Sequence, residues 1–240
     1  MHCPKCRFEQ TDTNTECPKC GIIFAKYRKT PPPSSAVSRE EGVFKRLLLD
    51  VETEYNAIAF WGRVVILLAL AVLSWKFAVS SFSGNDNPGG FMHFVNLPFH
   101  EAGHILFRPL GSFMTSLGGS LGQLLMPLVC VAAFLFFKRD AFAASVCMWW
   151  FGENFVDLAP YIGDARRLAL PLLGGNTGAD SPYGFHDWEY ILTEIGWLGH
   201  DHAIATAARL TGVLLMGLSV VWGGYVLFRI HTRRVEEPGG

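Results

Sequence analysis

An apolar stretch of the chain contains a short string of ionisable residues, "NLPFHEAGHILF" at 96–107. His100 and His104 are four residues apart, so on an α-helix both imidazoles lie on one face, about one turn apart. In this H-E-x-x-H pattern the histidines bind zinc, and Glu101 is the general base toward water. Ionisable side chains are costly in a membrane helix and are usually functional there. The alternative is a helix end at the membrane interface, with solvated His and Glu side chains.

Zinc at a catalytic site needs a third protein ligand and one open position. The segment 153–175, "ENFVDLAPYIGDARRLALPLLGG", offers Asp157 and Asp164. Asp157 lies three residues after Asn154, on the same helical face. Asp164 follows a proline and a glycine that would break a helix, and irregular backbone at membrane depth is tolerated where protein encloses a cavity. The residues themselves leave both aspartates open as the ligand.

Together these motifs give the chain a resemblance to the site-2 protease family of intramembrane zinc metallopeptidases. In that family an H-E-x-x-H helix supplies two ligands and the base, and a later transmembrane helix carries an Asn-x-x-Pro...Asp-Gly element whose aspartate is the third ligand. Residues 100–104 match the first motif letter for letter. Asn154, Pro160 and Asp164 follow in the order of the second motif, although the sequence reads Gly-Asp-Ala rather than Asp-Gly. The resemblance covers roughly residues 90–175 and implies Asp164 as the third ligand, with Asp157 as the alternative.

The activity implied by the resemblance is zinc-dependent hydrolysis of peptide bonds in a membrane-embedded protein or peptide substrate. Glu101 would take a proton from water and pass it to the leaving amine. Asn154 would hydrogen-bond the substrate backbone or the developing oxyanion. A non-catalytic zinc-binding membrane scaffold or adaptor is the main alternative, and the intact Glu101 argues against it. A di-iron membrane hydroxylase ranks last, because that chemistry needs more histidine ligands than the chain offers.

Further histidines and aspartates lie in segment 176–202, which contains His186, Asp187, His200, Asp201 and His202. We interpret this segment as an interfacial loop followed by an amphipathic helix, since its tryptophans suit a membrane interface. The alternative is a lid over the metal, with His186 or Asp187 as an extra ligand.

His93 and a pair of glycines complete the polar and small-residue pattern of the apolar region. His93 lies seven residues before His100, on the same helical face, and an interfacial position is favoured for it over a role beside the metal. Gly118 and Gly122 are four apart, a spacing that lets two membrane helices approach closely.

The N-terminal block carries a second candidate zinc site, formed by two C-x-x-C pairs: Cys3, Cys6, Cys17 and Cys20. Four thiolates at this spacing close a tetrahedral structural zinc site, and disulfides are the weaker alternative in the cytosol. About 28 residues cannot bury a sufficient core, so metal binding must supply the folding free energy. The block resembles the short zinc ribbons at the start of many bacterial proteins, which are folded caps or docking sites for a partner protein. We therefore expect two zinc ions, one catalytic and one structural.

Composition places the rest of the chain in a lipid bilayer. Half of the 240 residues are hydrophobic and only 17% are charged, which favours a membrane protein. The net charge of -1 gives no footprint for nucleic acid. Apolar segments at 57–80, 91–108, 112–137, 141–162 and 210–228 predict an all-α polytopic membrane protein with about five or six transmembrane helices.

The expected domains are a zinc ribbon at 1–28, a flexible linker at 29–43, a polytopic metallopeptidase-like domain at 44–232 and a tail at 233–240. The linker is rich in proline, serine and charge. The start of the chain lacks the features of a signal peptide, so we expect a multi-pass protein of the cell membrane with a cytosolic ribbon.

Overall fold

The protein is described by a computed structural model that covers residues 2–3, 5–6, 8–9, 11, 13–24, 48, 56–80 and 90–236, with the backbone alone at 234–236. Contacts divide the chain into two units, Met1–Val43 and Phe44–Gly240. The expected linker at 29–43 and the last four residues of the expected tail lie outside the described residues.

The first unit contains two short antiparallel pairings, each around one pair of cysteines. His2 pairs with Glu9, and Glu16 pairs with Ile23. Cys3 and Cys17 are buried although the unit is very small. The cysteines therefore form the centre of this unit, as the spacing of the two C-x-x-C pairs predicts.

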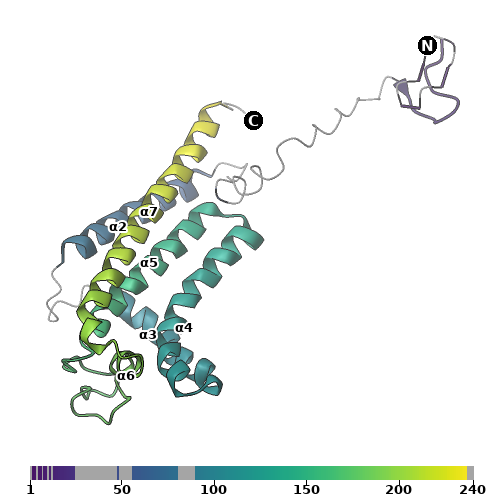
Figure 1. The fold of residues 1–240 in the computed structure, drawn as a ribbon. Helices are drawn as coiled ribbons and strands as arrows, with labels where there is room; N and C mark the ends of the chain where they lie inside the picture. The colour runs from purple at the N-terminus through teal and green to yellow at the C-terminus, as the bar shows by residue number, and fades with distance from the viewer. Residues whose placement is uncertain are drawn as a thin grey trace. The chain divides into compact units, whose positions relative to one another are not determined.

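The second unit is mostly helical in its described part, apart from a loop between Gly163 and Asp187 in which Pro171 pairs with Thr177 (Figure 1). The helices expected at 57–80, 91–108 and 141–162 occur within one residue of those bounds, and the last helix is longer than expected because it begins at Asp201. The elements in chain order are α2 (Ala57–Val79), α3 (Gly90–Phe107), η2 (Arg108–Leu110), α4 (Ser112–Ala132), η3 (Ala133–Lys138), α5 (Ala141–Gly163), α6 (Asp187–Glu194), η4 (Leu198–His200) and α7 (Asp201–Glu236).

Polar side chains define where several helices begin. The Asn56 side chain accepts a hydrogen bond from the backbone of Ala59 and starts α2, and Asp140 does the same for α5 through Ala143. Such caps satisfy backbone N–H groups that have no partner inside the helix. Asp140 also forms an ion pair with Arg63 at 3.2 Å, which ties the start of α5 to α2.

Three helical segments in the described ranges are long and apolar enough to cross a membrane: Ala57–Val79, Ser112–Lys138 and Leu198–Arg233. This is fewer than the five or six that the sequence predicts. Helices α3 and α5 fall short because they carry ionisable and amide side chains, among them His100, Glu101, Glu153 and Asp157, which lower their mean hydropathy. The expected apolar segments at 91–108 and 141–162 therefore combine apolar surface with polar side chains.

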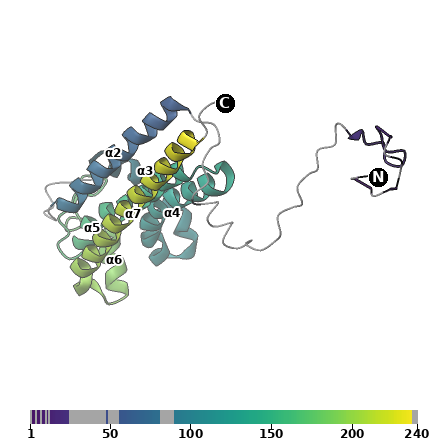
Figure 2. The same ribbon diagram turned by 90° about the horizontal axis from the view of Figure 1, so that it is seen from above.

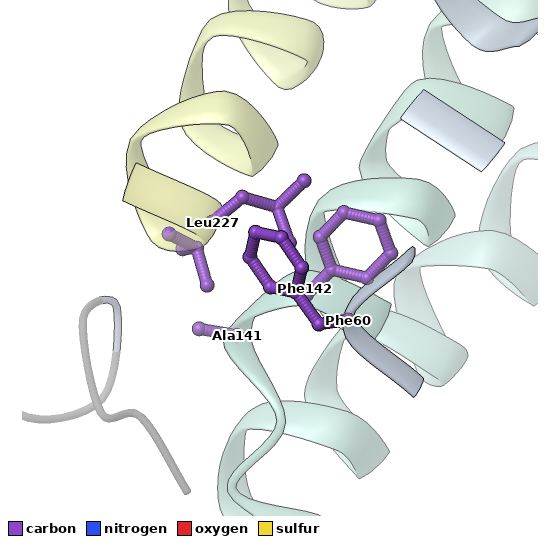
Figure 3. Packing of buried hydrophobic residues seen from close by; sticks show 5 residues of the cluster. Phe60, Ala141, Phe142 and Leu227 are labelled. Carbon is purple, nitrogen blue, oxygen red and sulfur yellow. The ribbon is translucent and has the colours of Figure 1, made fainter. Parts of the chain in front are cut away.

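Apolar packing holds the helices around one another (Figures 1 and 2). Helix α5 packs most extensively against α7, and α3 packs against α4. Figure 3 shows Phe60 of α2 meeting Phe142 of α5 and Leu227 of α7, with Ala141 beside them. Helix α6 lies at the end of the bundle where α7 begins (Figure 1).

Glycines permit the close approach of α3 to α4. A methyl group at Gly118 would meet the carbonyl oxygen of Gly103 and the side chain of Phe107, each at 2.7 Å for its nearest atom. Real side-chain carbons do not approach other atoms so closely, so these positions require glycine. The predicted small-residue contact is therefore present, and Gly103 of α3 is its partner.

Candidate metal centre

The two histidines of the H-E-x-x-H pattern lie on one face of α3 and point toward α4. Their ring centroids are 4.8 Å apart. Nδ1 of His100 lies 2.8 Å from the Gln123 side-chain oxygen, and Nδ1 of His104 lies 2.8 Å from the backbone carbonyl of Thr115. Both partners on α4 are oxygen acceptors, so each Nδ1 carries the proton and donates it. In the neutral form each Nε2 then presents a lone pair.

Asp187, in the first turn of α6, faces both of these Nε2 atoms. Its Oδ2 lies 3.1 Å from His100 Nε2 and 3.4 Å from His104 Nε2. One ligand atom from each of the three residues lies within 4.8 Å of the other two. Three electron-pair donors that converge in a partly buried site repel one another unless a cation or added protons compensate them.

The donor set fits zinc. Ligands held about 2.0–2.1 Å from zinc in a tetrahedral arrangement lie about 3.4 Å apart, close to the separations of 3.1 and 3.4 Å. Two imidazoles and a carboxylate also form a ligand set typical of catalytic zinc, with a fourth position left for water. The hydrogen bonds at both Nδ1 atoms are of the kind that orients metal-binding histidines.

Gly119 of α4 provides open space beside the donors. A methyl group there would lie 2.5 Å from His100 Nε2 and 2.7 Å from His104 Nε2. The absence of a side chain at this position leaves both nitrogen atoms accessible, so the site has room that any other residue would fill.

Asp187 is held in place by contacts from α5 and from its own helix. The Tyr161 hydroxyl donates to Asp187 Oδ2 at 3.2 Å and accepts from the Asp187 backbone N–H at 3.0 Å. Burial disfavours the Asp187 carboxylate, but without a metal ion the protonated forms of His100 and His104 donate to it from Nε2, which outweighs burial and lowers its pKa below the ordinary value. The carboxylate therefore faces the histidines in its charged form.

His186 caps the helix that presents Asp187. Its Nδ1 accepts from the backbone N–H of Glu189 at 3.2 Å, which starts α6 at Asp187. Burial is the main reason that the pKa of His186 is lowered, so the ring is neutral and its proton lies on Nε2. That nitrogen lies 3.5 Å from Asp164 Oδ2, an electrostatic contact that is long for a hydrogen bond.

The family resemblance implies that Asp164 is the third metal ligand. In the structure, Asp164 lies outside the group of metal donors. Its carboxylate accepts from the backbone N–H groups of Ala169 and Leu170, at 3.2 and 2.8 Å. Asp164 therefore stabilises the turn after α5 and contacts His186, one residue before Asp187. The physical reason is the end of α5 at Gly163, which leaves Asp164 beside unpaired backbone N–H groups of the following loop.

The alternative ligand, Asp157, also lies elsewhere. Its carboxylate oxygens contact His93 Nδ1 and Asn96 Nδ2, each at 3.0 Å. His93, for which we favoured an interfacial position, is thus an ion-pair partner of Asp157 with a half-exposed side chain. Neither aspartate that the sequence favoured belongs to the group with His100 and His104.

The two residues with expected catalytic roles occupy different positions. Glu101 is partly exposed and lies next to His100 on α3. Asn154 is fully buried, and its amide donates to the carbonyl of Trp150 on its own helix. This contact within α5 gives no support for the expected hydrogen bond from Asn154 to substrate.

The segment 176–202 contributes Asp187 to the metal donor group. The histidines of this segment lie outside that group. We expected an interfacial loop and helix there, and Asp187 instead occupies the position foreseen by the lid alternative. His200 and His202 are exposed. Asp201 is fully buried and forms an ion pair with Arg166 at 2.7 Å, which connects the loop after α5 to the start of α7.

The N-terminal cysteines form the second candidate metal group among the described residues, with all four sulfur atoms within 4.8 Å of one another. The Cys3 and Cys20 sulfurs are 3.7 Å apart, as are those of Cys6 and Cys17. A disulfide would need about 2.05 Å, whereas thiolates about 2.3 Å from zinc in a tetrahedral arrangement lie about 3.8 Å apart. The spacing therefore fits a metal site and excludes the disulfide alternative for these pairs.

Sequence reasoning did not single out Tyr161, Gln123 or Gly119. Gln123, a polar residue in the apolar 112–137 segment, was a signal that could have been used, since such residues in a membrane helix usually have a partner. Tyr161 and Gly119 carry no comparable pattern, because their roles depend on which helices meet.

Comparison of the chain with protein-family models, with curated proteins and with solved structures gives no match, so the assignment of this site depends on its own geometry and chemistry.

Proposed function

We propose that this protein is an intramembrane zinc metalloprotease, which hydrolyses peptide bonds of membrane-embedded substrates. The observation that carries the proposal is the convergence of His100 Nε2, His104 Nε2 and Asp187 Oδ2, with Glu101 between the two histidines in sequence. Metal binding alone does not require a carboxylate at that position, whereas hydrolysis requires a general base.

His100, His104 and Asp187 would hold the zinc ion, which would supply Lewis-acid activation of water and of the peptide carbonyl. Glu101 accepts a proton from water as the oxygen adds to the carbonyl carbon, and it then protonates the leaving amine nitrogen. The peptide C–N bond breaks, and the products are a carboxylate and an amine. Asp187 contributes the negative charge of the ligand set, and Tyr161 keeps its carboxylate in position through two hydrogen bonds.

Substrate access follows from the surroundings of the site. Helix α3, which carries Glu101, packs against α4, and α4 belongs to one of the three segments long and apolar enough to cross a membrane. A substrate helix must unwind to expose its carbonyl groups, because a helix keeps them in hydrogen bonds. We therefore propose a multi-pass protein of the cell membrane whose substrate enters from the bilayer. The zinc ribbon would lie on the cytosolic side and bind a partner protein or serve as a folded cap.

The decisive experiment is cleavage in proteoliposomes of a panel of synthetic single-span peptides, with products identified by mass spectrometry. The wild-type protein should cleave at least one peptide, and Glu101→Gln should lose cleavage while it retains zinc. Glu194→Gln is the matched control, because Glu194 is an exposed carboxylate outside the donor group that bonds the Tyr183 hydroxyl, a contact that glutamine preserves.

Zinc content separates the outcomes of this experiment. Loss of one zinc per chain in His100→Ala/His104→Ala, together with cleavage by the wild type alone, supports the proposal. Equal cleavage by wild type and Glu101→Gln would refute the role of Glu101. Zinc bound at the site without cleavage of any peptide would favour a non-catalytic zinc-binding scaffold.

A further inference from the structure

A second polar cluster lies between α3 and α5, apart from the metal donors. It contains His93 and Asn96 of α3 and Trp150, Glu153 and Asp157 of α5. Asn96 and Glu153 are 1% and 0% exposed, whereas the His93 side chain is 43% exposed. The cluster therefore extends from the surface of the helical unit to its interior.

One amide group links the two carboxylates of this cluster. Asn96 Nδ2 donates to Glu153 Oε2 at 2.9 Å and to Asp157 Oδ2 at 3.0 Å. The Asn96 side-chain oxygen accepts from the Trp150 indole N–H at 2.8 Å, which fixes the orientation of the amide. Both N–H groups of Asn96 therefore point toward carboxylates, and the two acids must lie close together.

The charges in the cluster do not balance. Asp157 has a partner that is cationic when protonated, since its Oδ1 lies 3.0 Å from His93 Nδ1. Among the described residues, Glu153 accepts a hydrogen bond only from the neutral Asn96, and its buried Oε1 has no hydrogen-bond partner there. The titratable groups that act on Glu153 are Asp157 on its own helix and His93 on α3. Two carboxylates thus share a single partial cation.

A charged Glu153 would be costly in this environment. Its carboxylate would be fully desolvated, with one oxygen lacking any donor. It would also repel Asp157 four residues later on the same helical face. A proton on Glu153 removes both costs, since the neutral acid needs no counter-charge.

We propose that Glu153 is a proton-binding site, occupied at neutral pH, that is separate from the metal centre. The proton is taken from water as H⁺ and leaves in the same form, without redox chemistry. Asp157 and the half-exposed His93 form the connection toward solvent. This proposal does not depend on the protease activity.

Proton binding at Glu153 has a structural consequence for α3. Asn96 bonds Glu153 and lies four residues before His100, on the same face of that helix. When Glu153 is protonated, the contact between α3 and α5 is free of charge repulsion. Helix α3 also carries two of the metal donors.

Infrared spectroscopy of the full chain in detergent tests this proposal at about pH 7, where an ordinary glutamate with a pKa of about 4.3 is ionised. The wild type should show the C=O stretching band of a protonated carboxylic acid. Glu153→Gln should lose this band, and Asp157→Asn should keep it. A wild type without the band, or a band unchanged in Glu153→Gln, would overturn the proposal.

A measurement on the wild type remains informative if Glu153→Gln does not fold. Incorporation of ¹³C-carboxyl-labelled glutamate should shift the protonated band, because Glu153 is the one fully buried glutamate in the described ranges. A band that shifts with labelled aspartate, and not with labelled glutamate, would refute the assignment.

Discussion

Substitution of Gly119 by alanine tests the geometry of the metal centre directly. The added methyl group would lie 2.5 Å from His100 Nε2 and 2.7 Å from His104 Nε2. Ordinary contacts of carbon with other heavy atoms are about 3.5–4.0 Å. One or both imidazoles must therefore move by about 1 Å, away from the positions at which they face Asp187.

The expected size of the effect follows from the cost of overpacking. Such a forced displacement typically costs about 1–3 kcal/mol. If the strain is relieved by movement of the imidazoles, zinc affinity at this site should fall about 5- to 150-fold, at about 1.4 kcal/mol per factor of ten. The N-terminal cysteine site belongs to the other unit and should keep its affinity.

Chelator competition on the purified full chain measures this effect, with zinc counted per chain. Gly217→Ala is the matched control, because Gly217 lies within α7 and a methyl group there would meet nothing within 4 Å. Its zinc affinity should equal that of the wild type. If Gly119→Ala binds zinc as tightly as Gly217→Ala, the imidazoles do not lie against Gly119, and the proposed centre is wrong.

Four further variants separate the parts of the two candidate sites. Asp187→Asn should remove one zinc per chain. Asp164→Asn should keep this zinc, with its affinity reduced about 10- to 100-fold at most, as for groups that orient a ligand. The opposite result in zinc analysis would restore Asp164 as the ligand. Tyr161→Phe leaves the Asp187 backbone N–H without its partner and should lower stability by about 1–3 kcal/mol, measured by thermal unfolding, and an unchanged midpoint would contradict that role. Cys6→Ser/Cys17→Ser should remove the other zinc, and simultaneous loss of both ions on zinc analysis would show that the two sites are not independent.

Much of the helical arrangement could be predicted from the sequence. The bounds of α2, α3 and α5 follow from long apolar runs that end at polar or glycine-rich segments, and these features are local. Three helices in the described ranges are long and apolar enough to cross a membrane, fewer than the five or six predicted, because α3 and α5 are apolar in most positions but carry buried polar residues. Hydrophobic length alone does not distinguish a lipid-facing helix from one that surrounds a polar site.

The candidate site was predictable only in part. Spacing placed His100 and His104 together, because residues four apart on a helix share a face. It did not distinguish Asp157, Asp164 and Asp187, because none of these aspartates lies at a fixed helical spacing from the two histidines. The family resemblance favoured Asp164, whose carboxylate instead accepts hydrogen bonds from the loop that follows α5.

The sequence by itself determined the features that depend on short spacing: the two-histidine face of α3 with Glu101 and the cysteine pairs of the N-terminal unit. Tertiary structure decided which carboxylate completes the metal group, because Asp187 reaches His100 only through the packing of α6 against α4 and α5. It also decided that Gly119 faces the imidazoles and that Glu153 is buried beside Asp157. These properties depend on which helix faces meet, and contacts between residues far apart in sequence leave no fixed spacing in the chain.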